Sequence, residues 1–249
     1  MTKMINVELR PFRAQTLRVS LSLGFAVALL MATAAATLAQ RLPGTENGEW
    51  RYLGGDAGHT RSSPLDQINA GNFEDLEPRW IWKSDNFGPN LDYFSRSTPI
   101  YVDGILYTVA TTRRQVVAID PATGETLWVF REPETVRQLR SPRQAYGKGV
   151  AYGEVDGRGV IYVTTPAFFL WALDAKTGRP LESWGEPVPL NGFSQTGVRD
   201  MVPDLLEGWG PWERWDEGTY DADYGIPREL GMVTSSAPPI VVNGVVVVL

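Results

Sequence analysis

The chain has 249 residues, of which 43% are hydrophobic and 21% charged, so it can build a folded core of one or two domains. Its net charge of -6 argues against a nucleic-acid partner, because a phosphate-binding protein needs a basic face. The chain has no cysteine, which excludes disulfides, thiolate metal sites and a catalytic thiol.

Residues 1–39 have the layout of a secretory signal peptide. Basic residues between positions 3 and 18 precede an apolar run at 19–39 that ends in small residues before Gln40. We therefore expect cleavage after Ala39 and export to the periplasm or cell envelope. The alternative is an uncleaved membrane anchor, because the apolar run is nearly long enough to cross a bilayer, so membrane association stays open.

The exported part, residues 40–249, begins with a turn-rich loop up to residue 75 and continues with short stretches typical of β-strands. These stretches are rich in Val, Ile, Tyr and Trp. They cover residues 79–83, 99–110, 115–120, 126–130, 159–165, 170–174 and 239–249. Asp103-Gly104 and Asn243-Gly244 are typical of hairpin turns, and no window shows a good helical period. The predicted class is all-β.

A repeat organises these strands. AIDPATGETLWVF at 118–130 recurs as ALDAKTGRPLESW at 172–184, and a third copy begins near Gly244. In each complete copy an Asp can accept bonds from turn amides, and a Gly lets the chain fold back. Trp128 is placed to fill the space beside a neighbouring unit with a large flat side chain. The repeat predicts a β-propeller of four-stranded antiparallel blades, with about one blade per copy.

The pattern Ala-x-Asp-x-x-x-Gly-x-x-x-Trp at 118–128 resembles the tryptophan-docking motif of quinoprotein dehydrogenases, which depend on pyrroloquinoline quinone (PQQ). The opening WRYLGGDAGHTRSSPLDQI at 50–68 and the segments 97–107, 147–153 and 235–248 resemble the same family. The resemblance implies an eight-bladed propeller that holds PQQ and calcium on its axis. Such enzymes oxidise alcohols or sugars in the periplasm and pass electrons to a quinone or cytochrome.

The chain departs from this pattern in length and in detail. At roughly 40–50 residues per blade, residues 40–249 supply four blades at most. An apolar strand also runs to Leu249, which leaves an open edge. We therefore expect a partial propeller, the amino-terminal part of a longer protein, that is inactive alone. Glu182 stands where the second motif should have Trp, although Trp184 is nearby. A Trp-rich insertion is predicted at about 185–232, either lining a pocket or, as we favour, packing on the outer wall.

The resemblance implies three contacts to PQQ. Arg96 matches a polar contact from the first blade, Lys148 stands where the family usually has Arg, and Ser235 matches a hydroxyl at the start of the third blade. Each also has a plainer interpretation, as a surface arginine, a surface lysine or a strand-cap hydroxyl. No calcium ligand and no catalytic base can be matched. His59 is predicted to be a solvated loop residue.

Two functions follow from these patterns. The first is a PQQ-dependent dehydrogenase acting on an alcohol or sugar. The alternative is a non-catalytic PQQ-like propeller that serves as a protein-binding scaffold at the cell envelope, because a fold alone does not fix a function. Lys148 and Gly153, which replaces a Trp common in the family and leaves the local packing uncertain, favour the scaffold mildly.

Overall fold

The computed structural model describes residues 43–84, 87, 92–145, 147–193, 196–202 and 236–248. The chain divides into two units, Met1–Pro43 and Gly44–Leu249, and the fold described below is that of the second. The predicted signal peptide lies outside the described residues.

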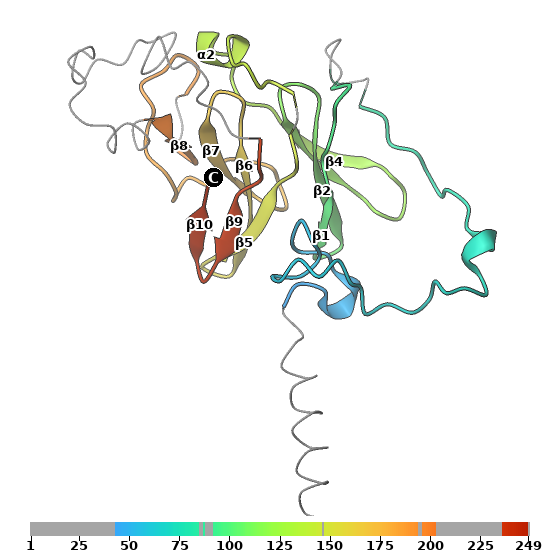
Figure 1. Ribbon diagram of the computed structural model, residues 1–249. Helices are drawn as coiled ribbons and strands as arrows, with labels where there is room; N and C mark the ends of the chain where they lie inside the picture. The colour runs from blue at the N-terminus through green and yellow to red at the C-terminus, as the bar shows by residue number, and fades with distance from the viewer. Residues whose placement is uncertain are drawn as a thin grey trace, which may run out of the picture. The chain divides into compact units, whose positions relative to one another are not determined.

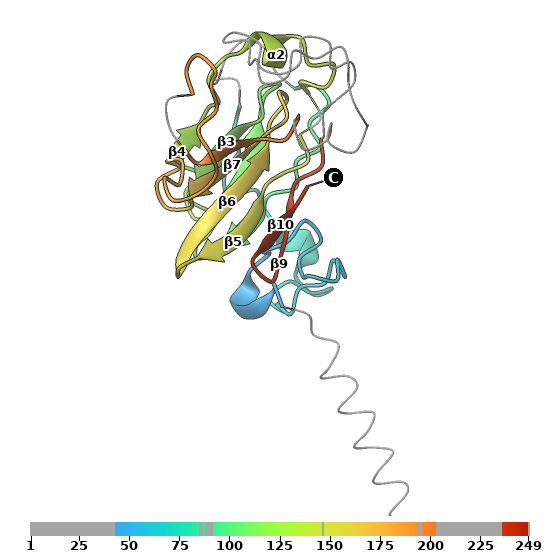
Figure 2. The same ribbon diagram turned by 90° about the vertical axis from the view of Figure 1, so that its left-hand side faces the viewer.

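The described residues of the second unit form two four-stranded antiparallel sheets and one hairpin (Figures 1 and 2). In both sheets the strands follow one another in chain order, as expected for propeller blades. Blade 1 consists of β1 (Ile100–Val102), β2 (Ile105–Ala110), β3 (Gln115–Ile119) and β4 (Thr126–Phe130). Blade 2 consists of β5 (Ala151–Val155), β6 (Arg158–Thr164), β7 (Phe169–Asp174) and β8 (Val198–Asp200). The separate hairpin consists of β9 (Ile240–Val242) and β10 (Val245–Val247). The all-β prediction is confirmed.

Helical structure is minor in the part of the chain that the structure describes. Two short 3-10 turns, η1 (Glu46–Gly48) and η2 (Phe73–Asp75), lie in the segment before blade 1. The short helix α2 (Val136–Leu139) lies between the blades, and the Thr135 hydroxyl caps it by accepting a bond from the Gln138 amide at 3.0 Å. One helical turn is too short for a sequence period to reveal it.

Trp128 connects blade 1 to blade 2. Its indole lies against Gly178, where an added Cβ would come within 2.4 Å of the ring. The indole N–H also donates to the carbonyl oxygen of Ala175 at 3.0 Å, so the residue is both packed and hydrogen-bonded across the blade boundary. The predicted placement of Trp128 beside a neighbouring blade is therefore confirmed.

Residues 79–83 repeat this geometry on blade 1. Trp80 lies against Gly124, where an added Cβ would be 2.7 Å from the ring, and donates to the carbonyl oxygen of Pro121 at 2.9 Å. The prediction of a strand at 79–83 is wrong, because these residues form no sheet ladder in the described structure. It lies against blade 1 as β4 lies against blade 2, and Ile81 on its other face is 78% exposed.

The two repeated turns are equivalent, as predicted. The Asp120 carboxylate accepts the amides of Ala122 and Thr123, and the Gly124 amide donates to the Asp120 carbonyl at 2.8 Å. In blade 2 the Asp174 carboxylate likewise accepts the amides at 176 and 177, and the Gly178 amide donates to the Asp174 carbonyl, also at 2.8 Å. The repeated sequence thus builds one turn at the same position of each blade.

The fourth strand of blade 2 is interrupted. Leu181 first pairs with β7 through a bond from its amide to the Ala172 carbonyl, and the chain then makes an excursion before β8 resumes the pairing. A bond of 2.7 Å from the Gly197 amide to the Trp184 carbonyl closes the neck of this excursion. Within the range predicted as an insertion, Val198–Asp200 form strand β8 of blade 2, and the insertion itself stays a prediction. Residues 194, 195 and 203–232 of that predicted range lie outside the described residues.

The interruption of the fourth strand also accounts for the exposure of Glu182. Because the chain leaves the sheet directly after Leu181, the residue at 182 is exposed. Trp184 instead packs edge-on against Tyr162, with ring centroids 5.8 Å apart.

The largest core cluster joins the two blades, from Ile100 and Tyr107 to Phe169 and Trp171. A second cluster joins blade 2 to the β9–β10 hairpin. Here a Cβ at Gly153 would lie 2.9 Å from Val241, so glycine allows β9 to approach β5 closely. The uncertainty over packing at Gly153 is thus resolved, because the missing side chain makes room for the hairpin.

The 50–61 segment has a structural role. Trp50 exchanges two backbone bonds with Tyr101 of β1, at 2.9 and 3.0 Å. The Asp56 carboxylate holds the following loop by accepting the amide and hydroxyl of Thr60, at 3.0 and 2.6 Å. His59 is exposed, as predicted.

Candidate functional site

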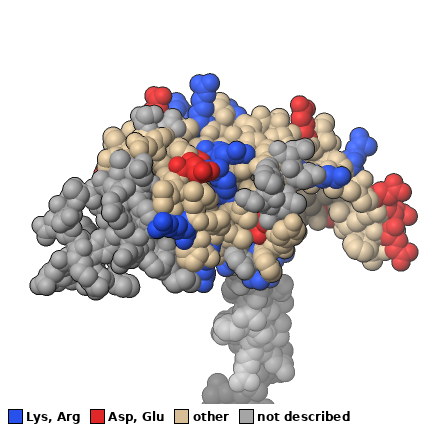
Figure 3. All heavy atoms as spheres, turned by 90° about the horizontal axis from the view of Figure 1, so that it is seen from above, with Lys and Arg blue, Asp and Glu red and all other residues tan. Residues whose placement is uncertain are grey.

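We call the first strands of blade 1, blade 2 and the hairpin, β1, β5 and β9, the inner strands. They all begin at the same end of the structure, the end that carries α2 (Figure 1). The connections from β2 to β3, from β4 to β5 and from β6 to β7 lie at this end, because the strands alternate in direction. Figure 3 views this end and shows Lys and Arg side chains at several places on it. The three residues predicted to contact a cofactor all precede an inner strand.

Lys148 joins the beginnings of these three strands. Its carbonyl oxygen accepts the amide of Thr98 at 2.9 Å, and its own amide donates to the carbonyl oxygen of Ser236 at 3.2 Å. Thr98 stands two residues after Arg96, and Ser236 directly follows Ser235. The structure thus joins Lys148 to Thr98 and to Ser236 through backbone bonds. Ser235 itself lies outside the described residues.

The side chains at this site remain accessible. Arg96 is exposed and Lys148 is half-buried, so both charges can meet a ligand from solvent. Gly149 has a φ of +144°, and a Cβ there would lie 2.9 Å from the Thr98 carbonyl oxygen. Glycine at 149 therefore permits the backbone contact that connects Lys148 to blade 1.

Arg114, which was not predicted as a site residue, lies directly beneath this region. It is 3% exposed and donates to the carbonyl oxygens of Thr164 at 3.2 Å, Arg143 at 2.7 Å and Ala145 at 3.4 Å. Burial lowers the pKa of its guanidinium to about 10, and the negative charge of Glu132 opposes that decrease. Its position in an Arg-Arg pair after a strand gave no sign that one of the two would be buried.

A buried polar layer continues from Arg114 toward blade 2. Glu132 lies fully inside the protein and accepts the indole N–H of Trp171 at 2.8 Å. Burial raises the pKa of its carboxyl to about 7, although hydrogen bonds from Thr165 and Trp171 and the charges of Arg137 and Arg113 act in the opposite direction.

Arg137 forms a buried ion pair in the same layer. Its guanidinium donates to both oxygens of Asp200, at 3.0 and 2.9 Å, and each side chain is 6% exposed. The guanidinium also lies over the Phe169 ring, 4.1 Å from its centroid. This bidentate pair fixes α2 to the outer strand of blade 2.

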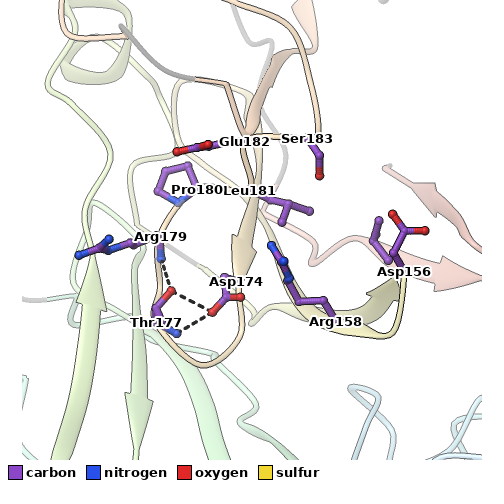
Figure 4. A pocket seen from close by; sticks show the side chains of 10 residues that line it. Asp156, Arg158, Asp174, Thr177, Arg179, Pro180, Leu181, Glu182 and Ser183 are labelled. Carbon is purple, nitrogen blue, oxygen red and sulfur yellow. Dashed lines mark hydrogen bonds between the residues drawn. The ribbon is translucent and has the colours of Figure 1, made fainter.

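A cavity of about 510 Å³ lies at the other end of blade 2, where the turns after β5 and β7 meet (Figure 4). Asp156 and Arg158 line one side of it, and Asp174, Arg179 and Glu182 line the other. It is remote from Lys148, because β5 leads away from Lys148 to Asp156. It therefore takes no part in the candidate site.

The described residues contain no group of three or more His, Cys, Asp or Glu side chains that could hold a metal ion. In the same part of the chain, no helix has the length and hydrophobicity needed to cross a bilayer.

The comparisons with known proteins concern the same blades. Residues 50–201 match the β-propeller domain of the PQQ-dependent glucose/ethanol/alcohol dehydrogenases. The chain belongs to this PQQ propeller family. It is 36% identical over 185 residues to the quinohemoprotein alcohol dehydrogenase ADH IIB of Pseudomonas putida, which covers 72% of the chain. It is 27% identical over 213 residues to the glycerol dehydrogenase large subunit of Gluconobacter oxydans, which covers 81% of the chain.

A solved PQQ propeller has the same arrangement of blades. The crystal structure of the quinohemoprotein alcohol dehydrogenase from Comamonas testosteroni superimposes with a TM-score of 0.55 and 26% identity, and covers 86% of this chain. The predicted partial propeller is thereby confirmed. The chain spans about a quarter of the length of these relatives, 25% for the Pseudomonas protein and 26% for the Comamonas structure.

Proposed function

We propose that this chain forms the first blades of a periplasmic PQQ-dependent dehydrogenase that oxidises an alcohol or a sugar. The observation that carries the proposal is the pair of backbone bonds through Lys148, which gathers the beginnings of three inner strands into one site. Membership of the PQQ propeller family supports the cofactor class. The relatives named as alcohol and glycerol dehydrogenases support the substrate class.

The residues of this site fit an anionic cofactor. Lys148 and Arg96 offer positive charge to the carboxylates of PQQ, and a guanidinium can hold a carboxylate through two parallel bonds. Ser235 would add a hydroxyl. The Thr164 hydroxyl, at the same end of β6, is buried and has no hydrogen-bond partner among the described residues. When bound, PQQ supplies the electrophile that accepts hydride from the substrate, and the protein supplies orientation and charge.

No residues of this site are assigned to calcium binding or to general-base catalysis. A calcium ion takes about six to eight oxygen ligands, and the described residues gather no such set. General-base catalysis also requires a base within hydrogen-bond reach of the substrate hydroxyl, and no residue here is assigned that role. The 249-residue chain is therefore expected to bind PQQ weakly and not to turn over substrate. We also propose export by residues 1–39 and, for the whole enzyme, a quinone or cytochrome acceptor.

The test is a PQQ titration of the 249-residue chain, followed by the absorbance and fluorescence of the cofactor. Lys148→Gln is compared with Lys176→Gln, which changes an exposed lysine on the turn at the opposite end of the blade. Loss of the charged contact should weaken PQQ binding by roughly tenfold in the first variant and leave the second unchanged. Equal affinities for both variants and the wild type would contradict the assignment of Lys148. Absence of PQQ binding by the wild type would favour the protein-binding scaffold.

A second assay adds calcium, an artificial electron acceptor and a panel of alcohols and sugars to the same samples. No dye reduction above the no-substrate control is expected. Reduction that a chelator abolishes would show that the chain is itself a working enzyme, and the division of roles proposed above would be wrong.

A further inference from the structure

Arg114 makes bonds that converge on one short stretch of chain, the Lys148 loop, defined as the described residues 143–145 and 147–149. The guanidinium donates to three carbonyl oxygens of the described residues, and two of these, those of Arg143 and Ala145, belong to this loop. The third, that of Thr164, ends the second strand of blade 2. One side chain rooted in blade 1 therefore ties the loop to both blades.

The loop is shaped to receive this side chain. A Cβ at Gly147 would come within 3.0 Å of the Arg114 Cγ and 2.9 Å of a Val109 methyl, so glycine allows the loop to lie directly on the arginine. Lys148 follows at once and forms the two backbone bonds that join Thr98 and Ser236. The contacts thus run without a gap from Arg114 to the charged residue of the candidate site.

The hydrogen-bond geometry depends on the planar, multi-donor guanidinium of Arg114 and not on its positive charge alone. Three carbonyl oxygens in different directions match the planar, multi-donor guanidinium, whereas an ammonium cannot reach them with the same geometry. The backbone at 114 has a φ of +51°, a conformation equally uncommon for arginine and lysine. An Arg-to-Lys change therefore keeps the charge and the backbone strain and removes only the fork.

We propose that Arg114 is a positioning residue for the cofactor site: its guanidinium holds the Lys148 loop in the conformation that presents Lys148 to the carboxylates of PQQ. This inference rests on the proposed function for its ligand but not for the loop contact itself. Arg114 touches neither the cofactor nor the reacting atoms in this role, and it acts only through Lys148.

The experiment compares Arg114→Lys and Arg114→Gln with Arg113→Lys in the 249-residue chain. Arg113 is a matched control, since it is the adjacent arginine and its guanidinium bonds to Glu134 at 3.1 Å and to the Glu132 carbonyl at 3.2 Å instead of the loop. Hydrogen exchange is followed at the amides of Lys148 and Thr98, with the β3 core as the internal reference. PQQ affinity is measured on the same proteins.

In both Arg114 variants the amides of Lys148 and Thr98 should exchange at least about tenfold faster, while those of β3 and those of the Arg113 variant stay unchanged. PQQ binding should weaken by a similar factor. In the double variant Arg114→Lys/Lys148→Gln the two effects on affinity should not add, because one residue acts through the other.

Unchanged exchange in the loop would overturn the proposal whatever happens to PQQ. Faster exchange together with additive effects on affinity would also overturn it, because Arg114 would then act independently of Lys148. Faster exchange across β3 as well would show a general structural role. If the wild type binds no PQQ, the proposed function fails, and the exchange of the Lys148 and Thr98 amides still decides whether Arg114 holds the loop.

Discussion

Glu132 should make the stability of the protein decrease as pH rises through the range just below neutral. A carboxyl with an ordinary pKa of 4.5 has a pKa of about 7 inside the folded chain, chiefly because burial disfavours its charged form. Between these two values the folded state binds a proton that the unfolded state has lost, so folding becomes less favourable as pH increases. Below pH 4.5 both states are protonated, and above about pH 7 both are ionised and the whole cost is present.

The magnitude follows from the two pKa values. At 1.36 kcal/mol per pH unit, the difference between 4.5 and about 7 corresponds to about 3 kcal/mol of stability lost across this window. Glu132→Gln removes the titration and keeps the shape of the side chain and an acceptor for the Trp171 indole. The variant should be close to the wild type near pH 4.5 and more stable than it by up to about 3 kcal/mol at pH 8.

The assay is urea unfolding of both proteins at intervals between pH 4.5 and 8, with the difference in unfolding free energy plotted against pH. Taking the difference removes the contributions of the other carboxylates, which the two proteins share. Glu134→Gln is the control, because the Glu134 side chain is 59% exposed and pairs with Arg113 at the surface. A constant difference between wild type and Glu132→Gln over the whole range would refute the reasoning, and so would an equal slope for the control.

Two further changes test how the blades are joined. Gly178→Ala should destabilise the chain by more than about 2 kcal/mol, because the new Cβ would clash with the Trp128 indole. Gly104→Ala is the control: Gly104 has a similar positive φ, but a Cβ there has no neighbour within 4 Å, so the change should cost only about 1 kcal/mol. Thermal unfolding compares the two variants. Arg137→Met should cost about 3 kcal/mol by leaving the buried Asp200 carboxylate without its bidentate partner. Adding Asp200→Leu should restore part of that loss in chemical denaturation, and no recovery would show that the pair is not the cause.

Local turn and strand chemistry made much of the fold predictable. The two Asp-x-x-Thr-Gly turns and the hairpins at 103–104 and 243–244 are specified by residues next to one another in sequence. Interactions between segments that are distant in the sequence could not be predicted from such local patterns. Residues 79–83 have the alternation of a strand, yet their stability in the structure comes from Trp80 resting on blade 1 and not from a ladder. The interruption of the fourth strand before β8 likewise depends on packing that no single segment encodes.

The candidate site was predictable to the extent that it follows a linear motif. Lys148 was proposed as a contact because the Gly-Lys-Gly-Val-Ala-Tyr segment resembles a family pattern, and an added Cβ at either flanking glycine would lie 2.9 Å from a neighbouring atom. Arg114 was missed because its role depends on three carbonyl oxygens that lie 29 to 50 residues away in the sequence. A buried cation bound by backbone carbonyls leaves no pattern of partner residues, since every residue type has a carbonyl.

The architecture shows which chain segments meet at the candidate site. In the described structure, backbone bonds through Lys148 join the segments that contain Thr98 and Ser236. Backbone bonds between adjacent segments fix their spacing, and Arg114 secures the middle one from below. Calcium takes about six to eight oxygen ligands, and the described residues gather no group of three or more His, Cys, Asp or Glu side chains. We therefore keep cofactor binding by these segments as a proposal, and the PQQ titration and the dye-reduction assay test it.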